Sequence, residues 1–320
     1  MRHNFLCHAI ILLIVQFLLI PNTTMAFHKN MTNNLSQLRQ GHWLYVGGSG
    51  SGNYSTIQSA IDNSSDGDMI YVYPGIYQET IHIDKSLVLN GEDKNSTIID
   101  GGKGKYVVEL YADDTKISNF TIQNASTDGL LIDCSRSIID NNIIKNNEYL
   151  GLAMRNSTNA SISNNFFTNN ERGLCLCLCC SHTYLYNNII TDNDYCGLYI
   201  YLSCNNHVFH NFFEKNKCGI ILSKSCNNSV YFNTIQSCKR CSLKLFESLN
   251  NTINNNNFIH SIICAFFLCC KNHWDGNYWH KPRIFPKPII GVIKEPGIKP
   301  AIEFDWHPAK QPYDIPQIVI

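Results

Sequence analysis

The sequence has little charge and no long apolar run after its first 20 residues. Charged side chains make up 16% of the 320 residues, and 25 basic ones balance 25 acidic ones, whereas an ordinary globular domain is roughly 25% charged. A neutral chain lacks the basic surface that nucleic-acid binding requires, so we expect no nucleic-acid partner. Because no later run reaches about 20 apolar residues, we also expect no transmembrane segment in the mature chain.

The N-terminus has the composition of an export signal. Arg2 precedes an apolar run over residues 5–20, and Thr24-Met25-Ala26 supplies the small residues of a peptidase site. This pattern predicts a cleaved signal peptide over residues 1–26, with an uncleaved membrane anchor as the alternative. The protein should then be secreted, periplasmic or at the cell surface. Without Cys7, fourteen of the fifteen cysteines remain, an even number that suits an oxidising compartment.

An internal repeat occupies most of the remaining chain. Glycines recur at spacings of 22, 22, 24 and 22 residues, and each opens a short stretch that alternates between core and surface, as in Gly129-Leu-Leu-Ile. Asparagine, present 39 times, marks a second register with the same period. Because two different residue types recur with the same period, the chain contains a true internal repeat. The repeated glycines are Gly129, Gly151, Gly173, Gly197 and Gly219, and the asparagines are Asn119, Asn142, Asn165, Asn188, Asn211, Asn233, Asn257 and Asn277.

The repeat predicts a parallel β-helix. Segments of about five residues with period-two alternation are strands, and a unit of 22–24 residues has room for two or three of them with turns but not for a helix. The spacings of leucine-rich and hexapeptide repeats are not found. Each unit should form one coil, about 4.8 Å above the last, so that equivalent residues form columns along the axis. The asparagine column suits turns, where stacked amides bond to one another and to the backbone.

Both ends of such a stack need a cover, because an open end offers unpaired backbone groups to other strands. Residues 56–61 form an amphipathic helical pattern, capped by Ser55 or Thr56, that we place over the first coil. The repeat stops after Trp279, and prolines follow at 282, 286, 288, 296, 300, 308, 312 and 316. We therefore expect an irregular, proline-rich C-terminal cap over residues 281–320, after a β-helix domain over 44–280 and an extension over 27–43.

Three motifs at the start of the repeat carry a resemblance. They are Tyr54-Ser-Thr-Ile-Gln-Ser-Ala-Ile-Asp, Gly67-Asp-Met-Ile-Tyr-Val-Tyr-Pro-Gly-Ile-Tyr-Gln-Glu and Leu87-Val-Leu-Asn-Gly-Glu. With them the chain resembles pectin-lyase-like proteins, and its asparagine-rich repeats and Asn277-Tyr278-Trp279 ending resemble the NosD-like group. The resemblance implies an all-β, single-stranded, right-handed parallel β-helix. It implies no single activity, because related coils include lyases, hydrolases, esterases, epimerases and non-catalytic sugar-binding proteins.

No catalytic residue can be assigned from the sequence. The later carboxylate motifs of pectin methylesterases and the motif set of polygalacturonases are missing, and the tandem pair Asp113-Asp114 suits a turn. A polysaccharide lyase would require an acidic cluster beside a basic residue, and one outward column holds only Asp133 as a carboxylate. We therefore favour a protein without catalysis, and we expect no cofactor.

Two outward columns on one face predict a carbohydrate-binding strip. Alternation places Asp133, Arg155 and Tyr201 in one column, with Tyr199 and Lys244 in its neighbour. Sugar rings stack on flat aromatic strips, so an extended glycan could lie there, although the rings could instead stabilise the fold or pack under a loop. The predicted ligand-binding residues are Asp133, Arg155, Tyr199, Tyr201, Lys244, Phe246 and Phe267.

The cysteines also fall into columns. Neighbours about 4.8 Å apart lie within the Cα range of disulfides, so we expect inter-coil disulfides or a mixture of disulfides and buried thiols. Alternation separates Cys175 and Cys177 from Cys179, which argues against a metal site in that cluster. The first predicted column is Cys196, Cys218, Cys241 and Cys264, and the second is Cys180, Cys204 and Cys226.

The sequence therefore predicts a secreted or surface β-helix protein that binds carbohydrate or cell-envelope glycan. A polysaccharide lyase or epimerase on the same scaffold is the first alternative. A NosD-like periplasmic accessory protein for copper, implied by the resemblance, is the second.

Overall fold

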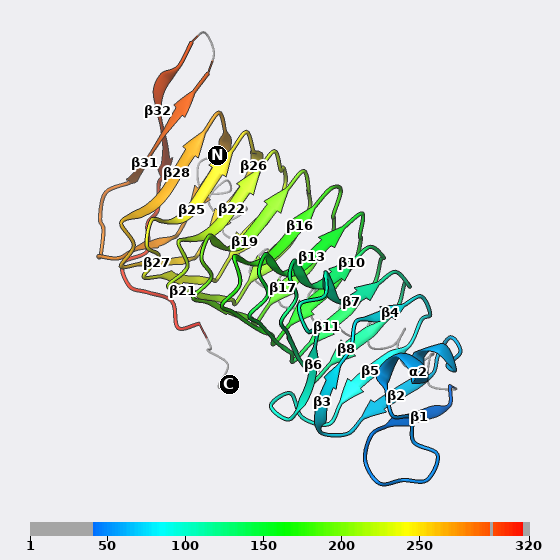
Figure 1. Cartoon of the computed structure of the whole chain (residues 1–320). Coiled ribbons are helices and arrows are strands. Elements are labelled where there is room, and N and C mark those ends of the chain that lie inside the picture. The colour runs from blue at the N-terminus through cyan, green and yellow to red at the C-terminus, as the bar shows by residue number, and fades with distance from the viewer. Residues whose placement is uncertain (1–40, 295–296, 316–320) are drawn as a thin grey trace, which may run out of the picture.

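The structure is a computed structural model that describes residues 41–294 and 297–315, and it shows coils stacked along one axis (Figure 1). Strands of successive coils pair in parallel, as the register of the long strands shows. The predicted parallel β-helix is confirmed. The predicted signal peptide over 1–26, and most of the predicted extension over 27–43, lie outside the described residues.

The strands form three faces, and the first of them carries the longest strands of the coils. We call it the long-strand face. Its strands are β4 (Ile81–Ile83), β7 (Tyr106–Leu110), β10 (Asp128–Ile132), β13 (Leu150–Arg155), β16 (Arg172–Cys177), β19 (Cys196–Tyr201), β22 (Cys218–Ser223), β25 (Cys241–Phe246) and β28 (Ile263–Leu268).

The other two faces consist mostly of strands of three or four residues. The second face contains β1 (Trp43–Val46), β2 (Met69–Val72), β5 (Val88–Gly91), β8 (Lys116–Ser118), β11 (Ile138–Asp140), β14 (Ser161–Ser163), β17 (Tyr184–Tyr186), β20 (His207–Phe209), β23 (Ser229–Tyr231), β26 (Leu249–Asn254) and β29 (Lys271–Asp275). The third contains β3 (Gly75–Gln78), β6 (Thr97–Asp100), β9 (Thr121–Gln123), β12 (Ile143–Lys145), β15 (Phe166–Thr168), β18 (Ile189–Thr191), β21 (Phe212–Glu214), β24 (Thr234–Gln236), β27 (Asn257–Ile259) and β30 (Tyr278–Trp279).

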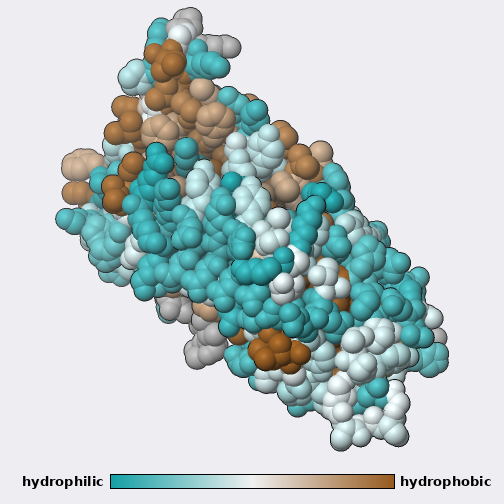
Figure 2. All heavy atoms as spheres, in the orientation of Figure 1, coloured by the Kyte–Doolittle hydropathy of each residue, from teal (hydrophilic) through white to brown (hydrophobic). Residues whose placement is uncertain are grey.

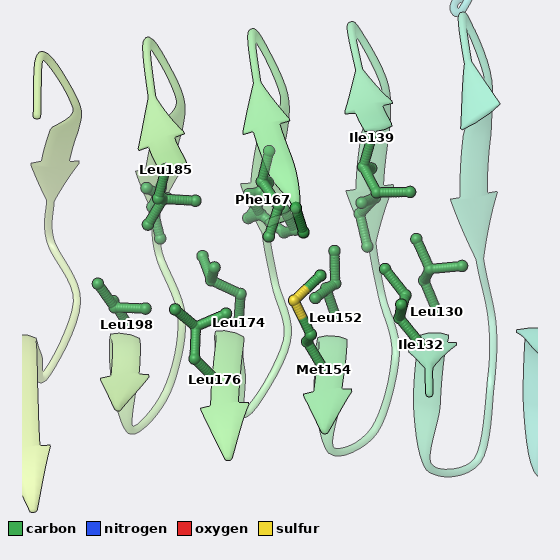
Figure 3. Packing of buried hydrophobic residues seen from close by; sticks show 14 of the residues in the cluster. Leu130, Ile132, Ile139, Leu152, Met154, Phe167, Leu174, Leu176, Leu185 and Leu198 are labelled. Atoms are coloured by element: carbon green, nitrogen blue, oxygen red, sulfur yellow. The ribbon is translucent and has the colours of Figure 1, made fainter. Parts of the chain in front are cut away.

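The interior is filled by aliphatic columns, as the alternation predicts. Leu130 lies in register with Leu152, which lies in register with Leu174, and all three are fully buried. Figure 3 shows these side chains pointing into the coil toward residues such as Phe167 from the opposite wall. Every inward side chain therefore packs against its own coil and both neighbouring coils, which fixes the register of the whole stack.

Asparagine ladders hold the turns. In the main ladder the backbone N–H of Asn165 donates to the side-chain oxygen of Asn188 at 3.0 Å, and the amide of Asn188 donates onward to Asn211 at 2.9 Å. The predicted column is confirmed at Asn142, Asn165, Asn188, Asn211, Asn233 and Asn277. Two of its predicted members are wrong: Asn256 takes the place of Asn257, and Asn119 lies one residue before Phe120, which donates its backbone N–H to Asn142. Two further ladders were not predicted: Asn147, Asn170, Asn193 and Asn216, and Asn206, Asn228, Asn251 and Asn272.

The N-terminal cap is a short helix, α2 (Ile57–Asp62), as predicted. Thr56 is its N-cap and accepts a hydrogen bond from the backbone N–H of Ser59 at 3.2 Å. The carboxylate of Glu79 accepts from the backbone N–H groups of Ile57 and Gln58, the first two residues of the helix, at 2.9 and 3.0 Å. The apolar face of α2 is buried, so the helix covers the first coil.

The C-terminal cap is more regular than predicted. Residues 281–320 were expected to be irregular, but β31 (Lys287–Ile293) and β32 (Lys299–Asp305) form an antiparallel hairpin that pairs with β28 and β29. Asp305 ends the main asparagine ladder, because its carboxylate accepts from the backbone of Asn277 and the indole of Trp279, both at 2.9 Å. Among the described residues, no helix is long and apolar enough to cross a bilayer.

Candidate functional site

The first predicted column lies on the outside of the long-strand face. Arg155 is in register with Cys177, and Cys177 is in register with Tyr201. Asp133, one coil before Arg155, accepts a hydrogen bond from the Nε of Arg155 at 2.8 Å. Ser223 and Phe246 continue the same column on the next two coils.

The second predicted column contains one wrong residue. Tyr199 and Lys244 are in it, separated by Ile221. Phe267 is not, because it is in register with Leu245 and is buried in the interior. Phe266 takes the outward place beside Lys244. The coil between Cys241 and Ile263 has 22 residues, one fewer than the coil before it, and this shift turns Phe267 inward.

The structure brings only some of the predicted ligand-binding residues together. Asp133, Arg155, Tyr199 and Tyr201 lie on β19 and the three coils that precede it, whereas Lys244 and Phe246 lie two coils further along. The rings of Tyr199 and Tyr201 are nearly parallel, with an interplanar angle of 12° and 5.9 Å between their centroids. Both side chains are half-buried, so part of each remains open to solvent.

An arginine that the sequence reasoning missed lies at the centre of this face. Its guanidinium carbon is 4.8 Å from the ring centroid of Tyr149, 5.0 Å from that of Tyr195 and 5.3 Å from that of Tyr199. This residue is Arg172, the first of β16. Cation–π contacts with three rings hold its planar group in place, and its Nε is buried without a hydrogen-bond partner among the described residues. We call Tyr149, Arg172, Tyr195, Tyr199 and Tyr201 the tyrosine–arginine cluster.

A buried carboxyl lies two coils before Arg172, in the same column. Asp128 is 9% exposed, and burial raises its pKa to about 6, although the N–H of Leu150, 3.3 Å away, and the charges of Lys105, Arg155 and Arg172 act in the opposite direction. A carboxyl that titrates near neutrality beside cations is a functional-site candidate. Asp128 and Arg172 both stand immediately before a repeat glycine, as Cys196 does. Following the cysteine column toward the N-terminus would have identified both.

The cysteine columns differ from the prediction in two places. Cys196, Cys218 and Cys241 are in register, but the next residue in that column is Ile263, so Cys264 is not a member. Cys226 donates its backbone N–H to the Sγ of Cys204 at 3.2 Å.

Cys180 is not in register with Cys204. Its backbone N–H donates to the hydroxyl of Ser203, the residue before Cys204, which shows that Cys180 stacks on Ser203 instead. Fourteen cysteines lie in the described ranges, and all of them are free thiols.

Two of these thiols lie on the long-strand face next to Tyr199 of the tyrosine–arginine cluster. Cys175 and Cys177 share a hydrogen bond, which raises the pKa of Cys175 and lowers that of Cys177. The charges of Arg155 and Arg172 also stabilise the Cys177 thiolate. Within residues 41–294 and 297–315, no three side chains of His, Cys, Asp and Glu come together as a possible metal site.

The comparisons with known proteins agree with this architecture. A family model described as "Right handed beta helix region" matches residues 106–258. The chain is a right-handed parallel β-helix protein. The handedness that the resemblance implied is thereby confirmed. A search of curated proteins finds no match.

Several solved structures share the right-handed β-helix. Pectate lyase Pel9A matches with a TM-score of 0.55 at 13% identity, over 72% of this chain and 76% of that one. The GH136 lacto-N-biosidase from Eubacterium ramulus matches with a TM-score of 0.58 at 10% identity, over 78% and 62%. Tailspike protein 2 of bacteriophage CBA120 matches with 0.52 at 13%, over 77% and 41%. This chain thus spans less than two thirds of the last two, and at these identities the likeness shows the fold alone.

Proposed function

We propose that the protein binds carbohydrate along the long-strand face, with the tyrosine–arginine cluster as the main contact. The observation that carries the proposal is the set of aromatic rings fixed around Arg172. Tyr149 and Tyr195 are 38% and 37% exposed, and Tyr199 and Tyr201 are stacked on each other. Rings held in place before binding lose little conformational entropy when a sugar stacks on them.

Polar groups beside the rings can hold the sugar hydroxyls. Arg155 and Asp133 form an ion pair on the column that also holds Tyr201. The guanidinium donates and the carboxylate accepts, so together they match a hydroxyl group or two neighbouring ones. Because equivalent residues repeat at about 4.8 Å along the axis, the face suits an extended chain of sugars rather than a single ring.

One comparison and one prediction from the sequence also support a carbohydrate ligand. Structures with the same fold include proteins named as a pectate lyase and a lacto-N-biosidase, both names of carbohydrate-active enzymes. An exported protein would also meet glycans outside the cell, in keeping with the signal peptide predicted over residues 1–26.

The two carboxyls of β10 do not have the spacing of a glycoside hydrolase. This strand and the residue after it supply two carboxyls, Asp128 and Asp133, five residues apart on one extended segment. At about 3.3 Å per residue, their Cα atoms are about 16 Å apart. Glycoside hydrolases place their two carboxyls about 5–9.5 Å apart, so this pair does not fit that chemistry.

One observation favours a second candidate, an enzyme that moves a proton on its glycan, as a lyase or epimerase does. The raised pKa of Asp128, about 6, leaves this carboxyl able to exchange a proton near neutral pH. The charge of Arg172 acts on Asp128, and Arg172 could neutralise an acidic substrate group.

The test starts with a glycan array probed with the full chain. Calorimetric titration of each glycan that binds then compares the wild type with Tyr199→Ala and Tyr201→Ala. We expect each substitution to weaken binding by about tenfold or more, as truncation of an aromatic anchor does. The matched control is Tyr45→Ala on β1, a tyrosine that is 39% exposed outside the long-strand face, and it should leave affinity unchanged.

Equal affinity in all four proteins, or no glycan binding at all, would contradict the proposal. Release of an unsaturated or epimerised sugar that disappears in Asp128→Asn would establish the enzyme candidate instead.

A further inference from the structure

The C-terminal hairpin has two apolar faces. Its inner face packs on the last coils: Ile289 is buried, and a Cβ added at Gly291 would lie 2.4 Å from the ring of Phe267. Its outer face carries the register pairs Ile290–Ile302 and Pro288–Phe304. Ile290 and Ile302 are 64% and 57% exposed.

Large apolar side chains gather around the hairpin. Eight of the nineteen exposed ones in the described ranges lie between residues 284 and 306. Figure 2 shows hydrophobic residues, in brown, gathered at the end of the molecule where Figure 1 places β31 and β32. Beyond the pairs already named, they are Ile284, Phe285, Ile293, Ile298 and Trp306.

Such a surface is unusual at the end of a solenoid. An antiparallel sheet that packs with one face normally presents a polar outer face, and terminal repeats need one for solubility. The outer face of β31 and β32 is therefore expected to contact another surface.

The charges around the hairpin are unequal. Residues 281–310 contain six Lys and Arg and three Asp and Glu. Two of the three acids turn inward: Glu303 accepts from the backbone of Asn272 at 3.0 Å, and Asp305 ends the asparagine ladder. The exposed cations Lys281, Lys294, Lys299 and Lys310 form no ion pair with any residue that the structure describes.

We propose that this hairpin docks on an anionic lipid surface. The interface of such a bilayer accommodates Ile, Phe and Trp side chains and attracts lysines, which matches the exposed apolar side chains and the excess of basic residues around the hairpin. A symmetric pair of copies fits less well, because it would bring two net-positive hairpins face to face. Docking through the end of the solenoid would leave the long-strand face free.

The test is sedimentation of the full chain with vesicles. One vesicle type contains equal parts phosphatidylcholine and phosphatidylglycerol, and the other contains phosphatidylcholine alone. The wild type should bind the anionic vesicles, bind the neutral ones far more weakly, and lose binding as salt is added. The double variant Ile290→Ser/Ile298→Ser should bind the anionic vesicles about tenfold more weakly. The control is Ile76→Ser on β3, an isoleucine that is 72% exposed far from the hairpin, and it should bind as the wild type does.

Sedimentation-velocity ultracentrifugation of the same proteins completes the experiment. A monomer that binds anionic vesicles through Ile290 and Ile298 supports the proposal. A dimer that dissociates in the double variant would show that a second copy covers the face and would overturn it. So would equal vesicle binding by all three proteins, or no vesicle binding by the wild type. Glycan binding should be the same in all three proteins, so failure here does not bear on the long-strand face.

Discussion

Arg172 lies over the ring of Tyr149, one coil earlier, with 4.8 Å between the guanidinium carbon and the ring centroid. The planar guanidinium is held between the rings of Tyr149 and Tyr195, which come from the two neighbouring coils. The compact ammonium of a lysine cannot stack on both rings in this way. We expect Arg172→Lys to weaken carbohydrate binding by about tenfold and to lower stability by about 1 kcal/mol. Calorimetric titration and chemical denaturation measure the two effects.

Arg136→Lys is the matched control for Arg172→Lys. Arg136 pairs with Asp113 and Asp114 in a turn outside the cluster. Its substitution should not change carbohydrate affinity, and equal losses in both variants would contradict the role given to Arg172.

The second prediction concerns the pH dependence of stability. Burial raises the pKa of Asp128 from 3.8 to about 6, so the folded protein holds this proton more tightly than the unfolded chain does. The stabilising contribution is full below about pH 4 and is lost as the pH rises through about 6. Asp128→Asn keeps the acceptor for Leu150 and should be more stable than the wild type by about 2–3 kcal/mol at about pH 8, with no difference near pH 3.5. Urea unfolding at both pH values measures this, and a difference independent of pH would disprove the assignment.

The third prediction concerns the main asparagine ladder. The side chain of Asn188 donates to the carbonyl of Ile162 at 2.8 Å and accepts from the backbone of Asn165 at 3.0 Å. Asn188→Ala leaves both buried groups unpaired and should lower the free energy of unfolding by about 3 kcal/mol. Asn187→Gly is the control, because Asn187 has a φ of +54° that glycine adopts easily, and its effect should stay below about 0.5 kcal/mol. Thermal or urea unfolding of both variants measures these changes in the free energy of unfolding. Equal losses in Asn188→Ala and Asn187→Gly would show that the ladder contributes little to stability.

The fourth prediction concerns Cys204 and Cys226, which are stacked on neighbouring coils. Oxidised glutathione should link them: the two protein thiols form one disulfide, and the oxidant is reduced to two molecules of glutathione. Peptide mapping under non-reducing conditions should find the cross-linked pair in the wild type and lose it in Cys226→Ser. Glutathione adducts on both cysteines without a cross-link would show that the stacked geometry does not allow the bond.

The fold could be predicted because one period of 22–24 residues governs glycines, asparagines and core residues alike. The exact members of each column could not be predicted. Coils differ in length by one or two residues, and the sequence does not say in which turn the extra residue lies. Cys264 and Phe267 were each assigned one position too far for this reason, since Ile263 follows Cys241 after 22 residues rather than 23. Asn257 was misplaced in the same way, beside the true rung Asn256.

The centre of the candidate site was harder to predict than the columns. Tyr149 and Tyr195 lie in turns, where alternation does not say which way a side chain points, and only the folded turns place them around Arg172. The C-terminal hairpin was missed because Pro288 and Pro300 argue against a strand. A two-stranded ribbon accepts them, since its outer edges need no further N–H donors.

The most direct measurement of carbohydrate binding on the long-strand face is hydroxyl-radical footprinting by mass spectrometry, with and without a glycan that the array identifies. The oxidation rates of Tyr149, Tyr195, Tyr199 and Tyr201 should fall when the glycan binds, while that of Tyr45 stays the same. Protection that appears on another face, or a bound glycan that leaves these four tyrosines as reactive as before, would contradict the account.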